Sequence, residues 1–106
     1  MKDRGGGTRN PSSFVLRPLS RVRQHAVFDL APGLLLVFKP RGHREATHAH
    51  PHEQRLRVLS GALEVRTARG VRRVAAGARA VRIAAGRAHA TRALADTWLI
   101  AERLPA

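Results

Sequence analysis

The chain has 106 residues, a formal net charge of +13 and neither cysteine nor tyrosine, which excludes disulfides, thiolate metal sites, cysteine nucleophiles and phenolic acids or bases. Its length suits one domain, and its longest strongly apolar run, Leu34–Phe38, is far shorter than the roughly 20 residues that a membrane span requires. Since residues 1–13 also lack the apolar stretch of a secretory signal, the sequence predicts a cytoplasmic protein without membrane contact.

Residues 1–12 are expected to form a flexible tail, and one domain is expected to fill residues 13–106. Within that domain, turn signals separate short segments in which apolar and polar residues alternate, as in Leu63–Arg66. The Ser60–Gly61 pair between two such segments predicts a hairpin turn. Regularly spaced glycines are typical of an all-β sandwich or barrel, and here they stand at Gly61, Gly70, Gly77 and Gly86.

A helical alternative exists for residues 68–95, which are rich in alanine and arginine. Glycines divide this region into pieces that are too short to form stable helices on their own. Alternation in the neighbouring segments also favours strands. We therefore predict an all-β fold.

Four of the six histidines lie close together in the stretch GHREATHAHPHEQ, residues 42–54. Residues two apart on an extended strand point to the same side, so His48 and His50 are expected to face one site. Neutral imidazole is a common ligand of divalent metals. A solvated histidine-rich loop without metal is the alternative, because Pro40 precedes the cluster and Pro51 lies within it.

The spacing around these histidines resembles the first sequence signature of the cupin superfamily, G-x5-H-x-H-x3/4-E-x6-G. Its positions fall on Gly42, His48, His50, Gln54 and Gly61, with glutamine where the pattern has glutamate. The stretch HAHPHEQ is similar to a subset of small bacterial cupins that carry H-x-H-P-x-E-Q and use the glutamine as a ligand.

A second cupin signature can be aligned with residues 77–93, where Gly86 and His89 keep its central part. Ala84 and Ala93 stand where proline and asparagine are usual, so this match is weaker. Together the two signatures imply a small cupin-type, RmlC-like jelly-roll β-barrel within residues 13–106.

The resemblance also implies a metal site, with His48, His50, Gln54 and His89 as ligands of one divalent transition metal: Fe, Mn, Co, Ni or Zn. These donors are all neutral, so the centre would favour a small anionic organic ligand. Glu53 is the rival of Gln54 and the stronger donor, but Gln54 has the strand parity of the histidines.

The other candidate residues have simpler expected roles. His52 shares the ligand parity but follows Pro51, so an edge or surface position is expected. We place His43 in the turn after Pro40 and His25 on a strand without a visible partner. Trp98 is expected in the core, with the pocket mouth as its alternative. The acids Asp29, Glu45 and Asp96 are candidate acids or bases without a recognisable constellation.

Three functions therefore stay open. The metal site would serve an enzyme of isomerase or dioxygenase type, or a non-catalytic module that binds or senses a small molecule. The high positive charge raises nucleic-acid binding as a third, less favoured function, because a GC-rich genome would also enrich arginine and the sequence lacks an aromatic stacking platform. Exposed sheet edges, with a contribution from the segment after Ser13, predict a homodimer.

Overall fold

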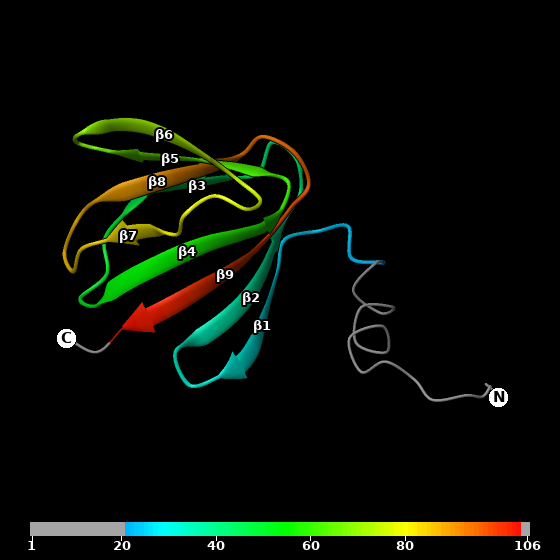
Figure 1. Ribbon diagram of the computed structural model, residues 1–106, viewed down its shortest axis with the longest axis horizontal. Coiled ribbons are helices and arrows are strands. Elements are labelled where there is room, and N and C mark those ends of the chain that lie inside the picture. The colour runs from blue at the N-terminus through cyan, green and yellow to red at the C-terminus, as the bar shows by residue number, and fades with distance from the viewer. Residues whose placement is uncertain (1–20, 105–106) are drawn as a thin grey trace, which may run out of the picture.

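The computed structural model describes residues 21–104, which fold into two antiparallel β-sheets that lie face to face (Figure 1). The all-β prediction is confirmed, and the helical alternative for residues 68–95 is wrong, because this region forms strands joined by turns. The predicted tail at residues 1–12 and the expected domain start at residue 13 lie outside the described residues. Among the described residues, no helix is long and apolar enough to cross a membrane.

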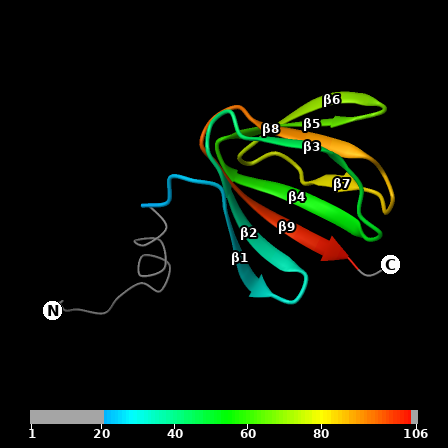
Figure 2. The ribbon, with the colours of Figure 1, turned by 180° about the vertical axis from the view of Figure 1, so that it is seen from behind.

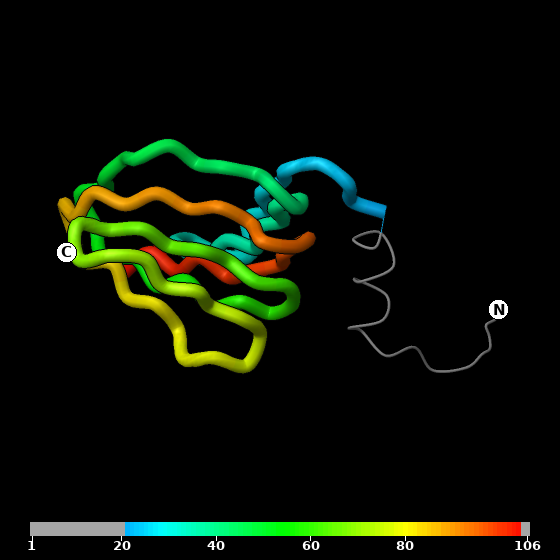
Figure 3. Tube along the Cα trace, turned by 90° about the horizontal axis from the view of Figure 1, so that it is seen from above, coloured from blue at the N-terminus to red at the C-terminus, as the bar shows by residue number. Residues whose placement is uncertain are grey.

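The larger sheet has the strand order β1-β2-β9-β4-β7, and the smaller sheet has the order β3-β8-β5-β6. The larger sheet consists of β1 (Ala26–Ala31), β2 (Leu34–Lys39), β9 (Thr97–Leu104), β4 (Glu53–Ser60) and β7 (Val81–Ile83). The smaller sheet consists of β3 (Arg44–His48), β8 (His89–Ala93), β5 (Ala62–Thr67) and β6 (Gly70–Ala75). The two layers are visible from the opposite side in Figure 2, and Figure 3 shows the smaller sheet lying over the larger one.

The apolar core lies between the sheets and follows the predicted alternation. Leu63 and Leu99 are 0% and 1% exposed and come from opposite sheets. Leu63 pairs with Ala93 on one side and Val74 on the other, and both of these are buried too. Burial of every second residue removes apolar area from water and fixes the register, since a slip by one residue would expose the whole row.

Trp98 lies in neither of its two predicted places. Its neighbours Thr97 and Leu99 are buried toward the core, so Trp98 points to the outer face of the larger sheet, where it is half-buried. Its ring packs against Phe38 at a centroid distance of 4.9 Å and against Phe28 at 6.2 Å. The described Phe28, Phe38 and Trp98 therefore form a cluster outside the cavity.

The predicted hairpin at Ser60–Gly61 is wrong, because β4 and β5 belong to different sheets. The turn instead passes the chain from one sheet to the other. Gly61 has a φ of 86°, and a Cβ here would overlap the backbone of Asp96 and Thr97. The Thr97 hydroxyl accepts a hydrogen bond from the Ala62 amide at 3.1 Å, which fixes the start of β5.

We expect Gly61→Ala to destabilise the fold by several kcal/mol, because the backbone must shift to make room for the methyl group. Gly77→Ala is the matched control, since Gly77 has a similar φ of 84° but nothing close to its Cβ position. Gly77→Ala should lower the free energy of unfolding by about 1–2 kcal/mol, because alanine is strained in the left-handed backbone conformation. Urea unfolding measures both free energies, and equal losses would contradict the steric explanation.

Candidate metal centre

Three histidines converge at one end of the smaller sheet. The potential ligand nitrogens of His48, His50 and His89 all lie within 4.8 Å of one another. His48 ends β3 and pairs with His89, the first residue of β8, while His50 follows in the loop after β3. The structure therefore brings the histidine of the second sequence signature beside the two of the first.

An irregularity in β3 sets which side chains face inward. The register between β3 and β8 shifts between Glu45 and His48, as it does at a β-bulge. On a regular strand, residues three apart would point to opposite sides, but Glu45 and His48 both line the same cavity. The loop beyond β3 is held by a hydrogen bond from the Gly86 amide to the His50 carbonyl, with an N–O distance of 2.7 Å.

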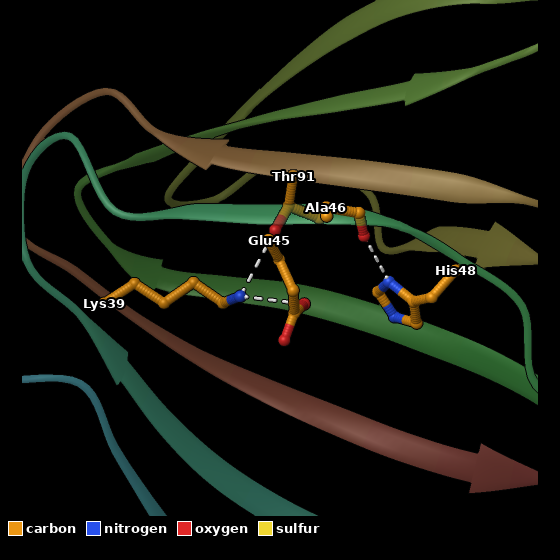
Figure 4. Close-up of polar contacts among 5 residues, drawn as sticks. All are labelled: Lys39, Glu45, Ala46, His48 and Thr91. Atoms are coloured by element: carbon orange, nitrogen blue, oxygen red, sulfur yellow. Dashed lines mark hydrogen bonds and ion pairs between the residues drawn. The ribbon is translucent and has the colours of Figure 1, made fainter.

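Backbone carbonyls orient two of the three rings. His48 Nδ1 donates to the Ala46 carbonyl at 2.8 Å (Figure 4), and His89 Nδ1 donates to the Arg87 carbonyl at 3.0 Å. A carbonyl can only accept, so Nδ1 carries the hydrogen in each ring and Nε2 keeps a free lone pair. Such a bond fixes ring orientation and tautomer in many metal sites.

The third ring is kept neutral by its surroundings. Partial burial lowers the pKa of His50, and positive charge on His48, His89 or His52 would lower it further. A neutral imidazole is the form that binds a metal, so this shift favours binding near neutral pH.

Gln54 and Glu53, the two rivals for a fourth ligand, lie in different surroundings. Gln54 lines the same cavity as the three histidines. Glu53 is not among the cavity residues, and its carboxylate binds the Arg82 guanidinium at 2.7 Å. His52, expected at an edge or on the surface, also lines the cavity and stacks on His50 with a centroid distance of 5.0 Å.

The cavity lies between the two sheets and has a volume of about 260 Å³. Its walls combine the histidines with apolar side chains, among them Leu35, Val37, Leu56 and Leu99. Charged side chains also reach it, namely Asp29, Lys39, Glu45 and Arg103. A cavity of this size, with polar and apolar walls, suits a small polar organic molecule.

Lys39 and Glu45 form an ion pair inside this cavity (Figure 4). Lys39 is only 4% exposed, and its Nζ donates to Glu45 Oε1 at 3.1 Å and to Thr91 Oγ1 at 3.2 Å. Burial by itself would raise the pKa of Glu45, but the charge and hydrogen bond of Lys39, together with His48 and His25, hold that pKa below its usual value. Glu45 is therefore ionised at neutral pH.

Lys39 was not among the predicted site residues. The prediction that Glu45 has no constellation around it is wrong, because Glu45 contacts Lys39. The signal for Lys39 was the alternation along β2, where Leu35, Val37 and Lys39 share the inward side. The signal for Glu45 was hidden by the bulge.

His43 and His25 lie beside each other, outside the histidine cluster. The His43 amide donates to the Pro40 carbonyl at 2.9 Å, as expected of a residue in the turn after Pro40. His25 immediately precedes β1 and stacks on His43 with a centroid distance of 4.2 Å. The prediction that His25 lies on a strand without a partner is therefore wrong.

Solved structures identify the fold. The chain is similar to an RmlC-like cupin from Shewanella frigidimarina, at 21% identity and a TM-score of 0.62 over 78% of this chain and 86% of the other. A cupin superfamily protein from Desulfitobacterium hafniense matches with a TM-score of 0.70 and 13% identity, over 80% and 82% of the two chains. The chain therefore has the fold of the RmlC-like cupins.

A further structural match is KdgF from Halomonas sp., at 27% identity and a TM-score of 0.63, which covers 77% of this chain and 89% of the other. No family model matches the sequence, and no curated protein matches it. The H-x-H-P-x-E-Q subtype therefore stays a prediction.

The donor set of the cavity fits a metal ion. Three imidazoles come within reach of one point, and two of them are oriented with Nε2 free. The Gln54 amide lies in the same cavity and offers an oxygen. Mixed nitrogen and oxygen donors suit first-row transition metals and zinc.

Proposed function

We propose that this cupin holds one divalent transition metal, Fe, Mn, Co, Ni or Zn, and binds a small anionic organic ligand beside it. The ligands of the metal are His48, His50, Gln54 and His89. The observation that carries the proposal is the convergence of three histidine nitrogens within 4.8 Å at the wall of a cavity. Such a metal, when bound, acts as a Lewis acid toward an oxygen of the ligand.

The charge of the cavity supports an anionic ligand. All four proposed metal ligands are neutral, so they leave the charge of a divalent ion uncompensated. The charged side chains of the cavity wall balance one another, since Lys39 and Arg103 are positive and Asp29 and Glu45 are negative. The excess positive charge that attracts an anion therefore comes from the bound metal ion.

The other cavity residues have distinct roles in this proposal. Thr91 and Glu45 hold the Lys39 ammonium in place, so its position is fixed before a ligand arrives. The apolar side chains Val37 and Leu99 are almost completely buried and limit the water around a bound molecule. Glu45, ionised and in the cavity, is the proton acceptor that a reaction of isomerase type would use.

A binding or sensing module without turnover uses the same residues, because fold does not decide between binding and catalysis. The predicted homodimer also stays a proposal. Its support is that β1 and β6 are edge strands among the described residues, and an edge strand can pair with a strand of a second copy.

Metal analysis and ligand titration test the proposal together. Elemental mass spectrometry of the purified protein should find about one metal per chain. Calorimetric titration with acetate, pyruvate and succinate should show tighter binding to the metal-loaded protein than to the chelator-treated protein. Binding without chemical change of any ligand would favour the sensing module over the enzyme. Absence of metal even after reconstitution would contradict the proposal.

A further inference from the structure

The outer face of the smaller sheet carries a row of charged residues that the cavity does not use. On β3, β8, β5 and β6, the residues between the inward-facing ones point away from the larger sheet. The strand register places Arg44 beside Arg92, Arg92 beside Glu64, and Glu64 beside Arg73. Arg66 lies on the same face of β5, two residues after Glu64. We call Arg44, Arg66, Arg73 and Arg92 the arginine face.

This face has excess positive charge. Four arginines stand against the single carboxylate of Glu64, which leaves three positive charges uncompensated among the described residues of this face. Arg44, Arg66 and Arg73 are exposed and form no ion pair with a described residue. Neighbouring strands lie about 4.8 Å apart, so the row from Arg44 to Arg73 spans roughly 14 Å.

Arg92, in the middle of the row, is incompletely bonded. Its Nη2 lies 3.4 Å from Glu64 Oε2, which is long for an ion pair, and its Nε is buried without a hydrogen-bond partner. A buried donor without a partner is uncommon in proteins. A phosphate that displaced Glu64 would give this guanidinium the paired acceptors that its shape matches.

The surface around this row is shallowly hollowed. The depression is lined by Arg44, Glu45, Ala46, Thr47, Glu64, Arg66, Ala90, Thr91 and Arg92. The charge of Glu45 is compensated by its ion pair with Lys39, so it does not offset the arginines. Guanidinium groups from three strands therefore surround one concave area, and a ligand that lies in it meets several of them at once.

The composition of the face favours a duplex backbone over other polyanions. It carries no aromatic side chain, and the described aromatics Phe28, Phe38 and Trp98 belong to the larger sheet, so the face offers no platform on which single-stranded bases could stack. Binding at a lipid surface usually adds apolar side chains that enter the bilayer interface. Near the arginines, Val71 is the one described large apolar residue that is exposed, which is too little apolar surface for a membrane anchor.

We propose that the arginine face binds the phosphate backbone of double-stranded nucleic acid, independently of base sequence. The binding would release counter-ions and weaken steeply with salt, as contacts between arginine and phosphate do. The proposal gives a role to part of the net charge of +13. It does not depend on the metal site, because the arginines point away from the cavity between the sheets.

A charge-matched pair of variants tests this proposal. Arg44→Glu/Arg73→Glu reverses two charges on the arginine face. Arg55→Glu/Arg57→Glu makes the same change in net charge at two exposed residues of β4, in the other sheet. Fluorescence anisotropy with a labelled 20-base-pair DNA duplex of random sequence, over a series of salt concentrations, measures the affinity.

The arginine-face variant should lose about tenfold or more in affinity, and its slope of log affinity against log salt should become shallower by about two. The β4 variant should lose less than about threefold. Thermal melting shows whether each variant is folded. Metal content equal to that of the wild type shows that the cavity is unchanged, so a loss of DNA binding is then not a consequence of a lost metal site.

Three outcomes would overturn the proposal. Equal losses in the two variants would show attraction by net charge alone, without a localised site. Tighter binding to single strands than to the duplex would exclude a site for the duplex backbone. Binding to phosphatidylserine vesicles without binding to DNA would assign the face to a lipid surface.

Discussion

Replacing His89 with alanine is expected to reduce the bound metal from about one ion per chain to background, with a loss of affinity of about 100-fold or more. Changing a residue that only supports a metal ligand already lowers metal affinity by about 10–100-fold. His89 is 3% exposed and comes from a part of the sequence far from His48 and His50, so no neighbour along the chain can replace it. Elemental mass spectrometry after reconstitution and desalting measures the loss.

His43→Ala is the matched control for this experiment. His43 is also a partly buried histidine, but it stacks on His25 and is not part of the cluster. Metal should raise the melting temperature of the wild type and the His43 variant, and leave that of the His89 variant unchanged, because only a bound ligand stabilises the folded state. Full metal content in the folded His89 variant would show that the three histidines do not form one site.

Replacing Lys39 with methionine is expected to weaken binding of small carboxylates by about 30-fold or more, since removal of one partner from a buried charged contact typically costs about 2–5 kcal/mol. Methionine fills a similar volume without charge. The variant should also be less stable than the wild type, because Glu45 loses the ammonium that compensates its partly buried carboxylate.

The double variant Lys39→Met/Glu45→Gln separates these two effects. It removes both charges of the pair, so its stability should return close to that of the wild type, as measured by urea unfolding. Carboxylate binding, measured by calorimetry, should remain weak because the positive charge is still absent. If the double variant regains wild-type affinity, Lys39 serves only to hold Glu45 and does not attract the ligand.

Local alternation in the sequence determined the fold class and half of the site. Side chains two apart on a strand share a face whatever the rest of the chain does, so the inward positions of Leu63 and Val65 followed from the sequence. The same parity favoured Gln54 over Glu53, and the structure has Gln54 in the cavity and Glu53 in an ion pair with Arg82. Strand parity is not the reason, because a loop separates β3 from β4 and the two strands belong to different sheets. The resemblance to the cupin signatures supplied the fold that the structural neighbours confirm.

The tertiary structure decided whatever depends on pairing between distant strands. The bulge in β3 that turns Glu45 inward and the contact of Glu45 with Lys39 arise from cross-strand register and packing, which no local pattern encodes. The transfer of the chain to the other sheet at Gly61 and the alignment of Arg44 with Arg92 and Arg73 have the same origin. The alternation of side chains along a strand is a local property of the backbone. The register between two strands depends instead on which side chains the two sheets bury together.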